Sequence, residues 1–177
     1  MDAKQLETFD IFNRMPSALC SAIAEKASLQ SYPADETILK QEEKAQYFYG
    51  LVSGEVELRF IFRDRVLKSD VRHEESVVRR WETIDTPVVL ETLQPGDLFG
   101  WSSLVSHNVY TGSVVATQPS EAIAIRAGEL RQLLDSDPSA GYMFMNTLSE
   151  IIASRLHWRT NKLLESWIEA FGVQHIK

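Results

Sequence analysis

The sequence of 177 residues has a single cysteine, Cys20, and no excess of basic residues. One cysteine excludes an intramolecular disulfide, a thiolate zinc site and a four-cysteine iron–sulfur cluster. Lysine and arginine total 18 against 25 aspartate and glutamate residues, a formal net charge of -7. Because proteins that bind nucleic acid need a basic surface, we expect no direct nucleic-acid binding. A hydrophobic fraction of 44% predicts a folded chain rather than a disordered one.

Long apolar runs and a targeting segment are also missing. The start, MDAKQLETFDIF, lacks a basic stretch followed by an apolar one, and no run of about 18 apolar residues occurs in the chain. We therefore expect no membrane segment and a cytoplasmic location. At roughly 100–200 residues per domain, the length predicts one domain, or one domain with a long appended element.

Catalytic and metal-binding motifs are missing as well. The histidines, His73, His107, His157 and His175, form no His-X-His pair, whereas a cupin-type metal site needs two or three histidines with a glutamate on neighbouring strands. His73 and His107 are the candidates for a haem ligand, and we interpret both as surface residues. Neither a Gly-X-Ser-X-Gly elbow nor a phosphate loop occurs. The sequence predicts a protein without catalytic activity, with a cupin-type metalloenzyme as the remote alternative.

A helical pattern opens the chain. Leu19 and Ile23 lie four residues apart after Pro16, and apolar residues also recur with a helical period before that proline. Proline is tolerated just ahead of a helix or in its first turn. We expect two short helices in residues 2–28, with the break near Met15.

The middle of the chain has short apolar runs separated by turn residues, a pattern typical of an antiparallel sandwich or barrel. Turns are expected at Gly54 and Gly96, because glycine is favoured in tight strand connections. The predicted strands are residues 37–39, 47–52, 56–62, 88–90, 113–116 and 122–125.

Residues 63–85 differ from the rest of this region because they are dense in charge of both signs. We predict an exposed excursion between two strands, in the form of a solvated hairpin extension. The alternative is a surface that docks a partner protein, since loops often carry function and Trp81 lies among arginines.

A second helical pattern begins at Gly128. Asp137 before Pro138 is a helix start, with aspartate as the N-cap and proline in the first turn. Only Gly141 interrupts the pattern up to Ala170, so the helix could be on the order of 45 Å long. Its apolar positions follow near-heptad steps, which predict a homodimer packed along this helix. In the alternative, the helix lies back across its own barrel.

Three motifs carry a resemblance to a known family. Residues 32–41 read YPADETILKQ, residues 47–56 read YFYGLVSGEV and residues 93–100 read LQPGDLFG. In this order, between short helices and a long one, they resemble the cyclic-nucleotide-binding domain of the catabolite-activator and fumarate-nitrate-reduction (CRP/FNR) regulator family. The resemblance spans roughly residues 6–168. It implies a mainly β fold with flanking helices: a double-stranded β-helix, or jelly-roll, barrel followed by a long C-terminal helix.

The resemblance also implies a domain division. Residues 1–136 correspond to the N-terminal helices and the barrel, and residues 137–177 to a dimerisation and signalling helix. Regulators of this family carry a helix-turn-helix after the long helix, whereas this sequence ends at Lys177. We expect a sensor module without a DNA-binding output of its own; a chain truncated before that motif is the alternative.

The resemblance places a phosphate-binding cassette after Gly100. In the family, a glycine–glutamate pair opens a short helix there, and an arginine followed by serine or threonine and alanine closes it. The helix start and the arginine receive the cyclic phosphate, and the glutamate accepts the ribose hydroxyl. Here Trp101 stands at the glutamate position and Tyr110 at the arginine position, with Thr111 and Gly112 following.

These replacements argue against ordinary cAMP binding, because hydrogen bonds to charged groups contribute roughly 1.5–3 kcal/mol each. The cassette predicts a sensor for a different small ligand, anionic or aromatic. In one alternative a cyclic nucleotide, cAMP or cGMP, still binds. In the other, Trp101 and Tyr110 fill the vacated pocket, and the protein is a ligand-free interaction module that docks a partner protein through residues 63–85 or the C-terminal helix. The candidate ligand-binding residues are Phe99, Gly100, Trp101, Ser102, Ser103, Leu104, Tyr110, Thr111, Gly112 and Ser113.

Overall fold

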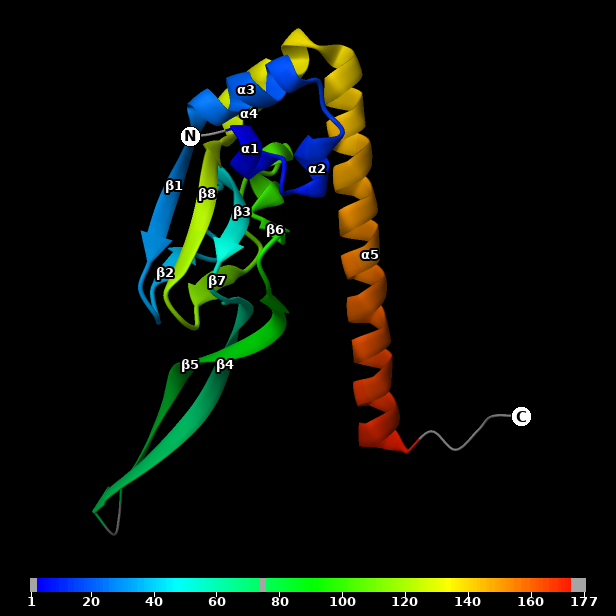
Figure 1. Ribbon diagram of the computed structural model, residues 1–177. Coiled ribbons are helices and arrows are strands. Elements are labelled where there is room, and N and C mark those ends of the chain that lie inside the picture. The colour runs from blue at the N-terminus through cyan, green and yellow to red at the C-terminus, as the bar shows by residue number, and fades with distance from the viewer. Residues whose placement is uncertain (1–2, 74–75, 173–177) are drawn as a thin grey trace. The chain divides into compact units, whose positions relative to one another are not determined.

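The computed structural model describes residues 3–73 and 76–172, without the side chains of residues 67–80. Those described residues form five α-helices, one 3-10 helix and eight strands (Figure 1). In chain order they are α1 (Ala3–Leu6), α2 (Asp10–Asn13), α3 (Ser17–Lys26), β1 (Ala27–Tyr32), β2 (Thr37–Leu39), β3 (Tyr47–Ser53), β4 (Val56–His73), β5 (Ser76–Leu93), β6 (Leu98–Phe99), η1 (Trp101–Leu104), β7 (Ser113–Ala116), β8 (Ser120–Arg126), α4 (Ala127–Ser136) and α5 (Pro138–Phe171).

The chain divides into two compact units. Met1–Ser28 together with Gly128–Lys177 form a helical unit, and Leu29–Ala127 form a strand unit. The domain division at residues 136 and 137, which the resemblance implied, falls between α4 and α5 and stays a prediction.

The strand unit contains two four-stranded sheets. One has the order β1-β8-β3-β6 and the other the order β2-β7-β4-β5. Strands far apart in sequence, such as β3 with β8 and β4 with β7, pair antiparallel. Side chains from both sheets and from two loops share one buried core: Leu39, Ala45, Tyr49, Leu51, Val56, Leu93, Phe99, Tyr110, Val114, Ala116, Ala122 and Ala124. The mainly β jelly-roll fold is thereby confirmed.

β4 and β5 extend far beyond this sheet. Each has 18 residues, and their ladder runs from Val56↔Leu93 to His73↔Ser76, whereas β7 pairs with β4 only as far as Arg59. The rest is a two-stranded ribbon (Figure 1). The predicted hairpin extension is confirmed. The strands are longer than predicted, because the ladder between β4 and β5 continues through the charged residues. The side chains of Arg79 and Arg80, part of the predicted docking surface, lie outside the described residues.

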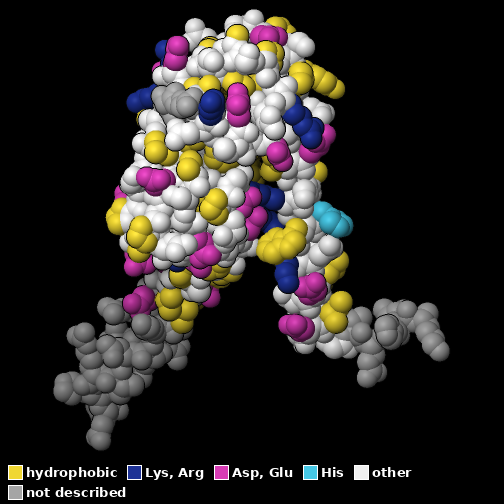
Figure 2. Space-filling view, viewed as in Figure 1, with side chains coloured by type: hydrophobic (Ala, Val, Ile, Leu, Met, Phe, Trp, Pro, Cys, Tyr) yellow, Lys and Arg dark blue, Asp and Glu magenta, His cyan; other side chains and the backbone are white. Residues whose placement is uncertain are grey.

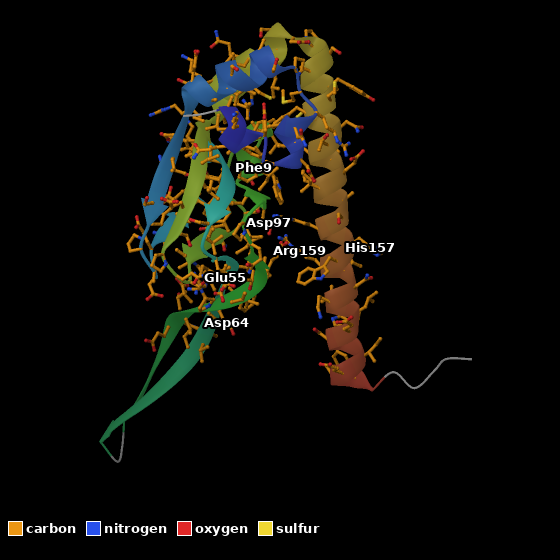
Figure 3. The ribbon with its side chains drawn as sticks, viewed as in Figure 1. Phe9, Glu55, Asp64, Asp97, His157 and Arg159 are labelled. Carbon is orange, nitrogen blue, oxygen red and sulfur yellow. The ribbon has the colours of Figure 1, made fainter. Side chains whose placement is uncertain are left out.

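The turns between β3 and β4 and between β7 and β8 are locked together. Gly54 has φ +84°, and a Cβ there would lie 2.2 Å from Ser120 Oγ, so only glycine fits. Glu55 donates its backbone N–H to that hydroxyl at 3.1 Å. Hydrogen bonds from the side chains of Gln94 and Thr117 hold the pKa of the Glu55 carboxyl below its usual range. Three turns therefore meet at Glu55, labelled in Figure 3.

The helical unit is held by aromatic packing. The rings of Phe12 in α2 and Phe144 in α5 lie 5.9 Å apart, and Phe9 meets Phe12 edge-on at 6.5 Å. Cys20 is buried, and its thiol lies 3.1 Å from the Phe12 carbonyl oxygen. Burial, with Glu7 adding to it, raises the pKa of this thiol. The lone cysteine is thus a packed, protonated core residue.

The N-terminal prediction is wrong in two places. The first predicted helix is split into single turns because Phe9 is extended, with φ -97° and ψ 125°, and Thr8 donates its hydroxyl to the Gln5 carbonyl at 2.7 Å. The break near Met15 is confirmed. The second helix ends at Lys26 rather than Ser28, because the chain turns directly into β1, a strand that the sequence pattern did not predict.

The start of α5 is confirmed. The Asp137 side chain accepts the N–H groups of Ser139 and Ala140, both at 3.1 Å, with Pro138 in the first turn. With 34 residues, the helix is about 50 Å long. The buried residues of α5 all lie near its start: Ala140, Phe144, Thr147 and Leu148. Within the described part of the chain, no helix is long and apolar enough to cross a membrane.

Candidate functional site

The predicted cassette begins at a tight turn between β5 and β6. The Asp97 carboxylate accepts the backbone N–H of Gln94 at 2.8 Å. β6 then pairs with β3, and the ring of Phe99 stacks on that of Tyr49, with centroids 4.9 Å apart and planes within 5°. The Gly-Asp-Leu-Phe-Gly motif therefore anchors the start of the cassette to the core.

Gly100 sets the direction in which the chain leaves β6. Its φ is +76°, and a Cβ would lie 2.9 Å from the Tyr47 carbonyl oxygen and 3.1 Å from the Tyr49 ring. Any other residue would clash with the backbone of β3. The one-turn helix η1 follows, with the Ser103 N–H donating to the Gly100 carbonyl at 3.0 Å. The short helix that the resemblance implied after this glycine is present.

Burial divides the predicted ligand-binding residues into two groups. The first group is at least partly exposed to solvent: Gly100, Trp101, Ser102 and Leu104, which are half-buried, and Thr111, which is exposed. The second group is buried: Phe99, Ser103, Tyr110, Gly112 and Ser113.

Tyr110, which the resemblance assigns to the position of the family arginine, lies in the core of the strand unit. Its side chain is only 6% exposed. The hydroxyl donates to the Tyr47 carbonyl at 3.1 Å and accepts the Tyr47 N–H at 3.2 Å. Burial raises the pKa of Tyr110, so the phenol stays neutral at physiological pH. Tyr110 ties the end of the cassette to the start of β3.

Tyr110 belongs to a tyrosine cluster that the sequence analysis missed. Tyr49 and Tyr110 are buried in the same core cluster, with Tyr32 and Tyr47 packed against it, and the rings of Tyr47 and Tyr49 lie 6.0 Å apart. Burial, with Glu36 adding to it, raises the pKa of Tyr32 to about 12. The run Tyr47-Phe48-Tyr49 was the available signal, but it could not identify a partner 63 residues away.

The loop between η1 and β7 is fixed by the segment that precedes β3. Tyr110 donates its N–H to the Glu43 carbonyl at 3.0 Å and accepts the Glu42 N–H at 2.9 Å. Ala45 donates to the Asn108 carbonyl at 3.0 Å, where Asn108 adopts a left-handed conformation with φ 47°. Backbone hydrogen bonds therefore hold the closing part of the cassette in place.

The histidines do not converge on a site in the described residues. His107 is exposed in the cassette loop. His157 is exposed on α5 (Figure 3), with its Nε2 3.2 Å from Asn161 Nδ2. The side chain of His73 and the whole of His175 lie outside the described residues. Among the residues described, no group of three or more histidine, cysteine, aspartate or glutamate side chains could hold a metal ion.

A comparison with protein-family models decides the family. The model of the cyclic nucleotide-binding domain matches residues 29–137, more than half of the chain. The chain belongs to the cyclic nucleotide-binding domain family. This cyclic nucleotide-binding domain covers the strand unit and continues through α4. The resemblance inferred from the three motifs is confirmed, and the fold supports a sensor or regulatory role.

Solved structures share the fold of this cyclic nucleotide-binding domain. A Geobacter metallireducens protein, named provisionally as a cyclic nucleotide-binding protein, is 25% identical with a TM-score of 0.67, over 89% of this chain and 99% of its own. The catabolite activator protein of Thermus thermophilus is 23% identical with a TM-score of 0.63, over 90% and 64%. The regulatory domain of Toxoplasma gondii PKA, crystallised with cAMP, is 16% identical with a TM-score of 0.64, over 86% and 48%. The comparison with curated proteins gives no match.

Proposed function

We propose that this chain is a non-catalytic regulatory domain that works as a cytoplasmic homodimer and does not hold a cyclic nucleotide through its cassette in the manner of the family. The observation that carries the proposal is the position of Tyr110. The residue that would pair with the cyclic phosphate is a neutral phenol, built into the core and bonded to the backbone of β3.

The energetics of this position support the proposal. Receiving a cyclic phosphate requires a cation, because charge-assisted pairing is roughly twice as strong as a neutral hydrogen bond. Tyr110 supplies no charge, and turning it toward a ligand would take its hydroxyl away from the N–H and carbonyl of Tyr47. Leaving a buried polar group without a partner costs about 1–3 kcal/mol. Phosphate binding at this position is therefore disfavoured both by the missing charge and by the loss of the hydrogen bonds to Tyr47.

The accessible part of the cassette supports a second candidate. Trp101 and Ser102 are half-buried and Thr111 is exposed, so two neutral hydroxyl groups and an indole of the cassette are at least partly accessible to solvent. A flat, weakly charged molecule would suit these groups better than a cyclic phosphate. Binding of such a molecule by the cassette is the alternative function.

The C-terminal half of α5 supports the homodimer. Leu163 and Trp167 are 56% and 58% exposed, and Leu156, seven residues before Leu163, is 65% exposed. Hydrophobic side chains lie along this part of the helix in Figure 2. Exposed apolar side chains at three-, four- and seven-residue spacing form a seam for a second helix. A second copy of the chain supplies the same seam.

A thermal-shift titration tests the cassette proposal. We expect millimolar cAMP or cGMP to leave the midpoint of unfolding unchanged, whereas a ligand at 100 times its dissociation constant would add roughly 2.7 kcal/mol of stability. A dose-dependent rise that disappears in Trp101→Ala would instead mean that the cassette binds the nucleotide, which contradicts the proposal.

The structural role of Tyr110 is tested separately by Tyr110→Phe, which removes only the hydroxyl. We expect a loss of about 1–3 kcal/mol in the free energy of unfolding, because the Tyr47 N–H and carbonyl lose their partner. The matched control is Tyr142→Phe on α5, where the side chain is 73% exposed and the change should stay within about 0.5 kcal/mol. Equal effects of the two substitutions would contradict this role.

A further inference from the structure

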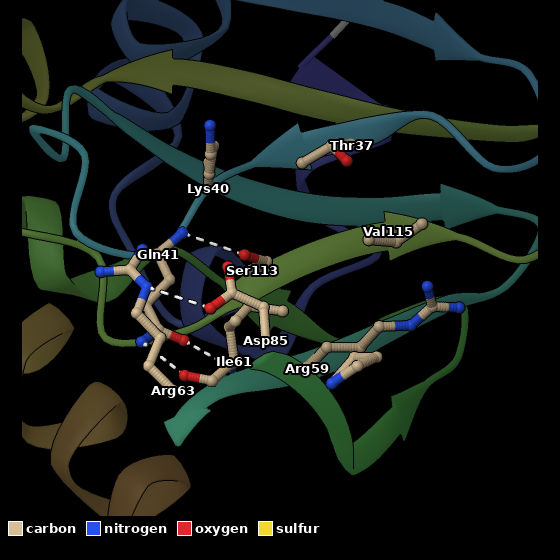
Figure 4. A pocket seen from close by; sticks show the side chains of 10 residues that line it. Thr37, Lys40, Gln41, Arg59, Ile61, Arg63, Asp85, Ser113 and Val115 are labelled. Atoms are coloured by element: carbon tan, nitrogen blue, oxygen red, sulfur yellow. Dashed lines mark hydrogen bonds and ion pairs between the residues drawn. The ribbon is translucent and has the colours of Figure 1, made fainter. Parts of the chain in front are cut away.

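A pocket of about 400 Å³ lies on the outer face of the sheet β2-β7-β4-β5 (Figure 4). Alternate residues of a strand point to opposite faces of its sheet. On β4, Val56 and Leu58 pack in the core, whereas Arg59, Ile61 and Arg63 line the pocket. The pocket is therefore separated from the core of the strand unit by the thickness of the sheet.

The pocket exists because β4 continues past the end of β7. β7 pairs with β4 as far as Arg59↔Ser113. One step further along β4, the side-chain amide of Gln41 takes the place of a neighbouring strand. Its oxygen accepts the Ile61 N–H at 2.7 Å and its nitrogen donates to the Ile61 carbonyl at 3.4 Å. Because a single side chain, that of Gln41, replaces the strand β7 here, a hollow remains. Its apolar walls are formed by Ile61, Pro87 and Val115.

A buried donor faces this hollow. Ser113 is 6% exposed and lines the pocket, and its oxygen accepts the Gln41 backbone N–H at 3.0 Å. Among the hydrogen bonds of the described residues, this hydroxyl gives its own proton to no protein acceptor. Buried hydroxyl groups normally have a hydrogen-bond partner. We therefore expect the Ser113 hydroxyl to donate to an acceptor inside the pocket.

The charged walls also favour an acceptor. The lining side chains include three cations, Lys40, Arg59 and Arg63, and one anion, Asp85, in a chain whose net charge is -7. Figure 4 shows Ser113 and Asp85 in the middle of the pocket, with the two arginines on either side. Four carboxylates, those of Glu42, Glu43, Glu57 and Asp85, pair with these three cations, so the pocket offers N–H donors rather than a net positive charge.

Neighbouring carboxylates hold the arginines in position. One oxygen of Glu57 takes two N–H groups of Arg59, at 2.7 and 2.8 Å. Arg63 lies between Glu42, at 2.9 Å, and Asp85, at 3.5 Å. A guanidinium has five N–H donors, so each arginine retains donors for a ligand. These pairs lower the net charge of the pocket. An organic anion, which also makes apolar contacts, is therefore favoured over a hydrated inorganic ion.

Lys40 is the cation that a ligand can recruit most easily. Its ammonium is 4.0 Å from Glu43, and the two side chains are 68% and 62% exposed. An exposed pair of this length contributes little to stability. Lys40 can therefore turn toward a ligand without a large loss elsewhere.

We propose that this pocket binds a small organic anion, a carboxylate or phosphate ester with an apolar body. The anionic group accepts from Ser113 and the surrounding cations, and the body lies against Ile61 and Pro87. Among the ten residues that the sequence analysis named for ligand binding, only Ser113 lines this pocket. The proposal goes beyond the regulatory role, because it gives the domain a ligand site separate from the rest of the cassette.

The test is a nuclear magnetic resonance titration of the full chain with indole-3-acetate, phenyl phosphate and the neutral analogue indole-3-acetamide. We expect saturable shifts of the amide signals of Gln41, Ser113 and Val115 with both anions. The neutral amide should bind about tenfold more weakly, since it loses the charge-assisted hydrogen bonds. Lys40→Gln, at an exposed position that does not affect folding, should weaken the anions by several-fold to about tenfold.

Two control variants localise the binding. Arg65→Gln removes a cation on the same face of β4, one alternate residue beyond the pocket, and should leave the dissociation constants unchanged. Trp101→Ala should also leave them unchanged, because Trp101 belongs to the cassette. Equal loss in Arg65→Gln and Lys40→Gln, equal binding of the neutral amide, or no saturable shift with either anion would overturn the proposal. None of these results depends on whether cyclic nucleotides bind.

Discussion

The two halves of α5 have similar sequence patterns and very different surroundings. In the first half, Ala140, Phe144 and Leu148 lie at four-residue steps and are at most 2% exposed. In the second half, Leu163 and Trp167 have the same spacing and are more than half exposed. The apolar period therefore specifies a helix throughout, but it does not specify what covers each half. The packing of the first half comes from distant residues such as those of α2.

β4 makes the same transition from buried to exposed. Val56 is fully buried, whereas Phe60 and Phe62, which alternate on the same face, are 39% and 53% exposed. An isolated two-stranded ribbon is only marginally stable in water. An element that keeps an apolar face after leaving its core has the composition of a contact surface.

The largest expected effect comes from breaking the buried half of α5. Phe144→Ala should lower the free energy of unfolding by about 3–5 kcal/mol, because it removes a buried ring and leaves a cavity beside Phe12. Denaturant unfolding in dilute solution measures this loss. The matched control, Phe171→Ala on the same helix, removes a ring that is 77% exposed and should change stability by about 0.5 kcal/mol or less. Similar losses at the two positions would mean that the halves do not differ in packing.

The next effect concerns the exposed half. Leu163→Glu combined with Trp167→Glu should weaken self-association about a hundredfold, because a dimer seam would have to bury unpaired carboxylates. Sedimentation over a range of concentrations measures the dimer dissociation constant. Glu165→Gln serves as the control, since Glu165 lies on the other side of the helix and pairs with Lys162. A wild-type chain that stays monomeric at every concentration would contradict the homodimer.

These contrasts show which features a sequence can predict. The turn at Gly54, the start of α5 at Asp137 and the Gly-Asp-Leu-Phe-Gly motif were predicted correctly, because each depends on residues within a few positions of one another. β1 was missed because its neighbour in the sheet, β8, follows it by almost the whole sequence of the strand unit.

The candidate sites were less predictable for the same reason. Tyr110 was named as a site residue, but its burial depends on Tyr47, 63 residues earlier. The outer pocket depends on Gln41 reaching Ile61 where β7 stops. The residues near Gln41 give no signal that β4 continues beyond the end of β7.

The smallest expected effect is at the N-cap of α5, next to its buried half. Asp137→Ala should cost about 1 kcal/mol, because the N–H groups of Ser139 and Ala140 lose their acceptor. Hydrogen exchange should be faster in the first turn, next to the buried half, and the dimer dissociation constant should not change. Asp137→Asn keeps an acceptor oxygen and should recover most of the stability. If it were instead as destabilising as alanine, the negative charge at the positive end of the helix dipole, rather than the cap hydrogen bonds, would be what stabilises this end of α5.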